Sequence, residues 1–315
     1  MHIFETGERV EYVQFLPDGE RLLIRSALSK TESEVAIWYP LTQEKVVLEL
    51  PQTPDDGYHE IYMSPKHANW VAIPDAGDVC YIASTDGSLY AFDTSDGTPL
   101  NEPDNRRADQ VVISSDGGWL VVVEHGLDDF PNGQHRMRGI EITPSGGHVL
   151  WEDDMIGWEE WPSLGGFLTG DEEFICVSKT GVRIRRFADG SIVRKGRFPA
   201  QWVNLPRLSP DRTKLGVVGS KFYLYDVDDL SHPRRLAVGP TTDEFVSYSF
   251  HPDMNQLAMI YTGPSLVKLF DLDTLKLTEK LNWKIGKLTS VDYSPNGALA
   301  AAGSEDGRVV IWDVN

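Results

Sequence analysis

The stretch that decides the fold runs from Ser290 to Asn315 and reads S-V-D-Y-S-P-N-G-A-L-A-A-A-G-S-E-D-G-R-V-V-I-W-D-V-N. Its apolar residues form three short runs, which are separated by Pro-Asn-Gly at 295–297 and Glu-Asp-Gly at 305–307. Glycine at the end of a tight turn tolerates the positive φ that the reversal requires. The pattern therefore predicts strand, turn, strand, turn, strand. Three such strands bury little apolar surface alone, so we expect them to stack on similar units.

Similar units precede this stretch. Each has a turn after its first strand, and the turns are spaced 41 to 54 residues apart. The marker residues of the seven turns are Pro17, Pro65, Ser115, Thr169, Pro210, Pro252 and Pro295. Each unit also ends its third strand on a related sequence, from A-I-W-Y at 36–39 to I-W-D-V at 311–314. Seven units near the 40–45 residues typical of a propeller blade predict a repeat protein, most regular in its last three units.

These units resemble the blades of the WD-repeat family, over the whole chain and most closely in the last unit. The resemblance implies an all-β, seven-bladed β-propeller of four-stranded antiparallel blades that forms one domain over residues 1–315. Family blades often hold a hydrogen-bonded Asp, His, Ser or Thr, and Trp. Ser304, Asp306 and Trp312 match this set, but Lys287 stands where the family has His. A seven-bladed propeller of another superfamily remains an alternative on spacing alone.

The last unit stops after its third strand, and the chain begins with the extended apolar segment His2-Ile3-Phe4-Glu5. In the family an N-terminal strand completes the last blade. We therefore expect residues near 1–6 to pair with 308–314, which would remove exposed sheet edges. A frayed N-terminus is the alternative. We also expect Trp312 to be buried between blades, with Ser304 and Asp306 supporting its turn.

Composition limits the possible partners. The chain has 48 acidic and 29 basic side chains and a net charge of −19, which opposes binding to nucleic acid or to an anionic membrane. A basic partner protein or peptide is favoured, although the charge can also serve solubility alone. No apolar run approaches a membrane span and no secretory signal is visible, so we expect a cytoplasmic monomer. Cys80 and Cys176 are predicted to be buried free thiols.

Two insertions suggest a partner surface. Residues 124–138 lie between the second and third strands of unit three, and residues 151–161 link units three and four. The family geometry implies that both lie on one face. The span 124–161 holds nine acidic and two basic residues and three tryptophans. Aromatic rings beside carboxylates suit a basic segment, and the alternative is that the tryptophans pack within or between blades. The predicted contacts are Trp158, Glu159, Glu160, Trp161, Asp128 and Asp129.

The mouth of the expected central channel is a second predicted contact region. The position eight residues before each turn marker should lie where the chain enters an innermost strand. These positions are Arg9, Gly57, Arg107, Trp161, Trp202, Glu244 and Lys287, with Tyr58, His59 and Phe245 one or two residues further in. Arg107, Trp202, Tyr58 and Phe245 are therefore added to the predicted partner contacts. A solvated funnel without a partner is the alternative.

Catalytic signatures are lacking in the sequence. None of the eight histidines has the spacing of a zinc site, and no phosphate-binding glycine loop or G-x-S-x-G elbow occurs. We therefore expect no cofactor, no metal and no enzymatic activity. The favoured interpretation is a non-catalytic interaction scaffold. The alternative is a propeller enzyme of the hydrolase or lactonase type, whose dispersed channel residues no motif would reveal.

Overall fold

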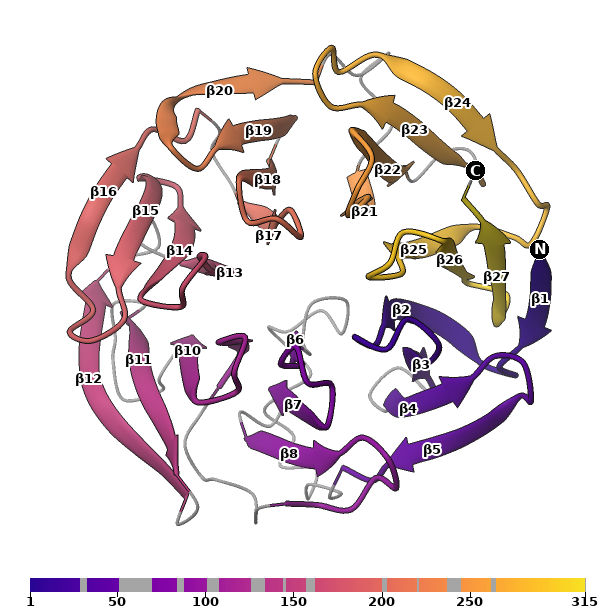
Figure 1. The fold of residues 1–315 in the computed structure, drawn as a ribbon, viewed down its shortest axis with the longest axis horizontal. Helices are drawn as coiled ribbons and strands as arrows, with labels where there is room; N and C mark the ends of the chain where they lie inside the picture. Colours follow the sequence, from indigo (N-terminus) through magenta and orange to yellow (C-terminus); the bar gives the residue numbers. More distant parts are fainter. Residues whose placement is uncertain are drawn as a thin grey trace. The chain divides into compact units, whose positions relative to one another are not determined.

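The computed structural model describes most of the chain. The described ranges are 1–28, 33–50, 70–83, 88–100, 108–125, 134–143, 146–156, 162–199, 203–219, 221–236, 245–261 and 265–314. None of these residues is helical, so the described part of the chain contains no helix that could cross a membrane. The strands of the described ranges form seven antiparallel sheets, each a blade (Figure 1). The predicted all-β, seven-bladed β-propeller is confirmed.

The chain divides into two compact units. One comprises residues 1–49 and 235–315, and the other comprises residues 50–234. The single domain over 1–315 therefore stays a prediction.

The first unit contains blades one, six and seven. Blade one consists of β2 (Arg9–Phe15), β3 (Leu22–Ala27), β4 (Ser33–Tyr39) and β5 (Glu44–Leu48). Blade six consists of β21 (Phe245–Phe250), β22 (Gln256–Tyr261), β23 (Val267–Asp271) and β24 (Leu277–Leu281). Blade seven consists of β25 (Leu288–Tyr293), β26 (Leu299–Ser304), β27 (Arg308–Asp313) and β1 (His2–Glu5).

The strand β1 closes blade seven. It runs antiparallel to β27, in a register that pairs His2 with Ile311 and Glu5 with Arg308. The backbone N–H of Thr6 extends the pairing by donating to the carbonyl of Gly307 at 2.8 Å. Closure by an N-terminal strand is thus confirmed.

The second unit contains blades two to five. Blade two has three strands in the described ranges, β6 (Trp70–Ala72), β7 (Val79–Ala83) and β8 (Leu89–Asp93). Blade three consists of β9 (Gln110–Ile113), β10 (Trp119–His125), β11 (Gln134–Thr143) and β12 (Gly146–Ile156). Blade four consists of β13 (Ser163–Phe167), β14 (Glu173–Ser178), β15 (Gly181–Arg186) and β16 (Ile192–Gly196). Blade five consists of β17 (Asn204–Leu208), β18 (Lys214–Val218), β19 (Phe222–Asp226) and β20 (Asp229–Arg235).

Burial within each unit follows the strand's place in its blade. The second strands, such as β14 and β26, are buried almost throughout, because neighbouring blades cover both faces of the sheet. The fourth strand β24 is mostly exposed and correspondingly polar. Cys80 in β7 and Cys176 in β14 are buried free cysteines, as predicted, and burial raises the pKa of both thiols.

Candidate functional site

The turn between the first and second strands of a blade, here called the first turn, has a shared geometry in the second unit. The N–H of its fourth residue donates to the carbonyl of its first residue, as in Gly117 to Ser114 at 3.1 Å and Arg212 to Ser209 at 2.8 Å. The fourth residue is left-handed in all four blades. The φ values are 72° for Gly77, 77° for Gly117, 58° for Asp171 and 59° for Arg212.

Blades four and five thus place charged residues at a position that favours glycine. A left-handed non-glycine residue costs on the order of 1 kcal/mol and persists only where the surroundings compensate. The compensation here is mutual, because Nη1 of Arg212 donates to the Asp171 carboxylate at 3.0 Å. It also donates to the carbonyl of Leu168 at 3.1 Å. Two strained residues of opposite charge therefore hold each other.

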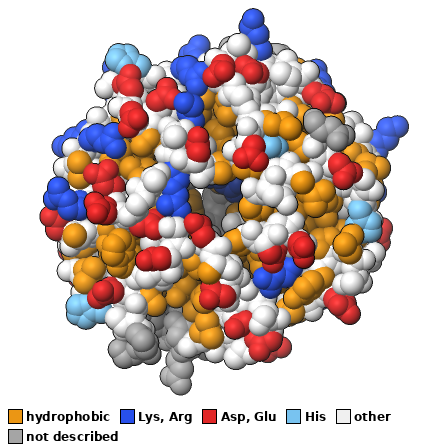
Figure 2. Space-filling model, viewed as in Figure 1, with side chains coloured by type: hydrophobic (Ala, Val, Ile, Leu, Met, Phe, Trp, Pro, Cys, Tyr) orange, Lys and Arg blue, Asp and Glu red, His pale blue; other side chains and the backbone are white. Residues whose placement is uncertain are grey.

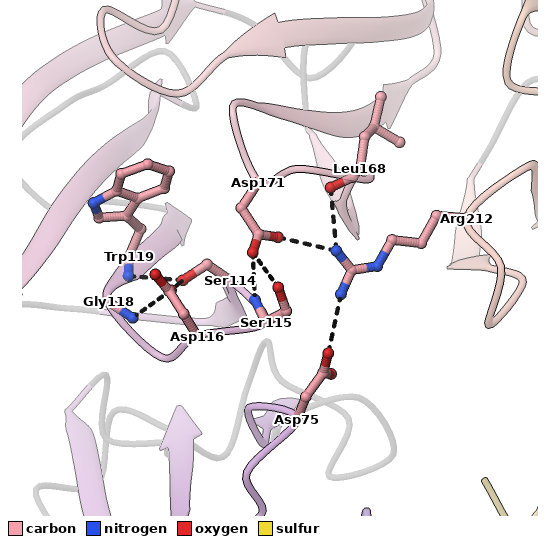
Figure 3. Close-up of polar contacts among 9 residues, drawn as sticks. All are labelled: Asp75, Ser114, Ser115, Asp116, Gly118, Trp119, Leu168, Asp171 and Arg212. Carbon is pink, nitrogen blue, oxygen red and sulfur yellow. Dashed lines mark hydrogen bonds and ion pairs between the residues drawn. The ribbon is translucent and has the colours of Figure 1, made fainter. Parts of the chain in front are cut away.

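The pair belongs to a network that joins the first turns of four successive blades (Figure 3). The other carboxylate oxygen of Asp171 accepts from the backbone N–H of Ser115 at 2.9 Å and from its hydroxyl. The carbonyl of Ser115 accepts from the N–H of Asp75 at 3.1 Å. The Asp75 carboxylate in turn lies 3.8 Å from Nη2 of Arg212. We call Asp75, Ser115, Asp171 and Arg212 the turn cluster.

One end of the turn cluster is buried and the other is open. The side chain of Asp171 is 10% exposed, that of Arg212 is 22% exposed and that of Asp75 is 74% exposed. The sequence did not predict this cluster, and Pro65 is wrong as the turn marker of unit two, because the first turn of blade two lies at residues 74–77, between β6 and β7. The signal of the cluster is the charged fourth residue of L-T-G-D (168–171) and S-P-D-R (209–212), where L-P-D-G (16–19) and S-S-D-G (114–117) have glycine.

Asp116, in the first turn of blade three, should make the stability of the protein depend on pH. Its carboxylate accepts from the N–H of Gly118 at 2.9 Å and from the hydroxyl of Ser114 at 2.7 Å. These hydrogen bonds lower the pKa of Asp116 below its ordinary value of 3.8. The ionised carboxylate therefore stabilises the folded state above that value, and its contribution is lost as the pH falls through the lowered pKa.

We expect Asp116→Ala to lower the free energy of unfolding at neutral pH, because the variant loses these hydrogen bonds. The loss should be only about 1 kcal/mol, because the side chain is exposed. The difference from wild type should shrink on acidification, as measured by thermal unfolding at a series of pH values. Asn296→Ala is the matched control, because Asn296 accepts the equivalent bonds from Ala298 and Ser294 without titrating. Equal pH dependence of the two variants would contradict the assignment.

The edge of blade three differs from the expected loops. Residues 134–138 belong to β11 and residues 152–156 to β12, so the expectation of loop structure is wrong for them. His125 pairs with His135, and Gln134 pairs with Ile156. The strands that flank residues 126–133 and 157–161 therefore end at the same edge of the sheet.

Most of the described carboxylates at this edge pair with arginines, whereas Asp128, Asp129, Glu159 and Glu160 lie outside the described residues, so the acidic partner surface stays a prediction. Glu124 is buried against Arg138, which also lies 3.1 Å from Glu152. The remaining pairs are Asp153 with Arg185 at 2.5 Å and Asp154 with Arg136 at 2.7 Å. Four of the nine counted acidic residues are thus paired with three arginines, across strands or between blades.

Trp151 packs within the blades, as the structural alternative expected. The pairing of β11 with β12 skips Leu150, and this bulge places Trp151 over Gly139. A Cβ at Gly139 would lie 2.2 Å from the indole nitrogen, so this position requires glycine. The indole N–H donates to the carbonyl of Phe187, and the ring stacks on Phe174 with centroids 5.9 Å apart.

Most of the predicted partner contacts lie outside the described residues. These are Tyr58, Arg107, Asp128, Asp129, Trp158, Glu159, Glu160, Trp161 and Trp202, and so are Gly57, His59 and Glu244 of the predicted channel mouth. Phe245 begins β21, is half-buried and has its ring centroid 4.8 Å from that of Tyr261. All of these assignments stay predictions.

Two members of the predicted channel mouth meet in the first unit. Arg9 and Lys287 both pair with Glu305, at 3.1 and 3.0 Å from the same carboxylate oxygen. Charges of both signs are interspersed elsewhere too, as the face in Figure 2 shows. Among the described residues, no group of three or more His, Cys, Asp and Glu side chains could hold a metal ion.

The contacts around Trp312 fit the expected role of its neighbours. Trp312 lies in the core between blades six and seven, and Ser304 bonds the backbone of Arg308 at 3.0 and 3.2 Å. Asp306 pairs with the Arg308 guanidinium at 3.0 Å. Lys287, at the position of the family histidine, instead pairs with Glu305.

Comparison with known proteins supports the fold and the repeat. Residues 280–313 match the family described as WD domain, G-beta repeat. The chain is 31% identical over 93 residues to the cross-pathway control WD-repeat protein 2 of Flammulina velutipes, covering 29% of this chain and 26% of that protein. It is 33% identical over 67 residues to the small ribosomal subunit protein RACK1 of Neurospora crassa, covering 21% of each. The matches thus span about a quarter or less of these relatives.

A solved structure resembles the whole chain. The β-propeller domain of Cps50 (Swd1) from Myceliophteria thermophila matches with a TM-score of 0.73 and 13% identity, covering 100% of both chains. At this identity the likeness concerns the fold alone. The match of residues 280–313 confirms the predicted resemblance to the WD-repeat family, and the chain is a seven-bladed β-propeller whose last blade matches a WD repeat.

Proposed function

We propose that this chain is a non-catalytic scaffold that binds a partner protein through a basic segment. The WD-repeat match carries the proposal, because the similar proteins include the MST50-interacting protein 11 of Pyricularia oryzae, 33% identical over 67 residues, and a ribosomal subunit protein. Their names describe proteins that work in contact with others. In this proposal the chain is a cytoplasmic monomer that needs no cofactor and binds neither nucleic acid nor membrane.

We place the partner at the edge of blade three. The described strands that precede and follow residues 126–133, and the strand that precedes residues 157–161, end side by side there, since the pairs His125–His135 and Gln134–Ile156 are adjacent. The described carboxylates of the edge already pair with arginines. In this proposal the acidic residues of the two segments attract the basic segment of the partner. The net charge of −19 adds a long-range attraction for a basic partner.

The test is a triple variant, Trp158→Ala with Glu159→Lys and Glu160→Lys. We expect it to fold normally and to lose the protein that the wild type captures from native lysate, identified by mass spectrometry. Wild-type capture should weaken as salt rises, because exposed charge pairs are screened. The chain itself offers a matched control.

The control variant is Leu277→Ala with Asp273→Lys and Glu279→Lys. These residues are exposed on and beside β24, and the change in charge is identical. It should capture the partner as the wild type does. Equal capture by both triple variants, or capture that persists at high salt, would contradict the proposed surface.

A further inference from the structure

At the exposed end of the turn cluster, part of the Arg212 guanidinium makes no hydrogen bond to the described residues. Nη1 of Arg212 donates both of its hydrogen bonds, to Leu168 and to Asp171. Nη2 and Nε have no hydrogen-bond partner among the described residues, because the Asp75 carboxylate, at 3.8 Å, is beyond bonding distance. The guanidinium is nevertheless fixed, since its inner edge is held by Asp171. A pre-oriented donor edge thus lies beside an exposed acceptor.

The backbone also points to a role for this arginine. Arg212 occupies the left-handed position that glycine fills in blades two and three. Glycine would adopt the turn without strain, so the fold of blade five does not require arginine here. What arginine adds is its contact with Asp171 and the outward donor edge beside Asp75.

The local charges indicate which group fits. Arg212, Asp171 and Asp75 together carry a net charge of −1, which disfavours an incoming carboxylate. An ammonium on Asp75 would be repelled by the Arg212 guanidinium, whose Nη2 lies 3.8 Å from the Asp75 carboxylate. A neutral primary amide satisfies both groups, because its carbonyl accepts from Arg212 while the N–H on the same side donates to Asp75. We propose that Arg212 and Asp75 form a binding point for the side-chain amide of an asparagine or glutamine in a partner peptide, independent of the blade-three surface.

The test uses short peptides with an N-terminal acetyl group and a C-terminal N-methylamide, so that only an asparagine side chain supplies a primary amide. It follows the backbone amide NMR signals of Asp75, Ser115 and Asp171. We expect Gly-Asn-Gly at millimolar concentrations to shift these signals saturably. Gly-Gly-Gly has the same backbone amides without a side-chain amide and should bind at least tenfold more weakly. Gly-Asp-Gly and Gly-Lys-Gly should also bind at least tenfold more weakly than Gly-Asn-Gly.

Arg212→Gly is the informative variant, because glycine removes the left-handed strain at position 212 and so offsets part of the loss of the two hydrogen bonds to Leu168 and Asp171. The backbone amide spectrum of the free variant checks that the fold is retained. Arg212→Gly should weaken peptide binding at least tenfold, as should Asp75→Ala. Arg186→Ala is the matched control, since Arg186 is an exposed arginine of the same unit that pairs with Asp189. The absence of saturable shifts with Gly-Asn-Gly, equal or stronger binding of any of the other peptides, or unchanged binding by Arg212→Gly would each overturn the proposal.

Discussion

Replacement of Trp312 by alanine is expected to lower the free energy of unfolding by about 3–5 kcal/mol, the range for truncating a large buried aromatic side chain. Trp312 is 8% exposed and lies in a core cluster that blades six and seven share. Its ring centroid is 4.4 Å from that of Trp283, in the link between the two blades. Truncation therefore removes packing from both blades at once. Chemical denaturation of the full chain measures the effect.

Two further variants make the Trp312 result interpretable. Trp312→Phe keeps an aromatic ring and should lose clearly less stability than the alanine variant. Leu277→Ala, at an exposed position of β24, should change the stability by less than about 0.5 kcal/mol. A loss below about 1 kcal/mol for Trp312→Ala would be incompatible with the burial seen here.

The repeat made the architecture predictable from sequence. Glycines at the fourth position of the first turn in several units, such as Gly117 and Gly297, indicate a left-handed backbone, and both have positive φ. The unfinished last unit and the segment 2–5 likewise predicted the pairing of β1 with β27. Signals of this kind are local, and repetition strengthens each of them.

The long hairpin of blade three was not predictable in the same way. Its polar end was interpreted as loop, although His135 and Met137 are buried on alternate positions of β11. The hairpin of β11 and β12 is held by partners distant in sequence, including the pair of Asp153, on β12, with Arg185 of the next blade. A hydrophobic pattern does not predict a strand whose polar residues are paired with residues of another blade.

The turn cluster shows the same limit for the candidate site. Asp171 and Arg212 are 41 residues apart, and Ser115 lies 56 residues before Asp171. No short motif links them. Only alignment of the first turns, with glycine in some units and charge in two, marks these positions, and their contact requires the packing of successive blades.

Removal of residues 1–6 is the second change with a large expected effect. Phe4, 3% exposed, packs in a cluster with Trp38 of blade one and Val309 and Ile311 of blade seven. Loss of this side chain alone should cost about 3–5 kcal/mol. Deletion also leaves the edge of β27 unpaired, which favours aggregation. We therefore expect a lower melting temperature and lower solubility, measured by thermal unfolding and light scattering.

Buried and exposed side chains alternate along β1. Two point variants can therefore separate the effect of losing a buried side chain from the effect of shortening the chain. Phe4 points into the core whereas Ile3, its neighbour, is 39% exposed. Phe4→Ala should therefore reproduce most of the loss in stability, because it opens a cavity between blades one and seven. Ile3→Ala should have a small effect and should leave solubility unchanged, since the strand and its pairing with β27 persist. If deletion of residues 1–6 leaves stability and solubility unaltered, or if both point variants behave alike, β1 does not close blade seven in solution.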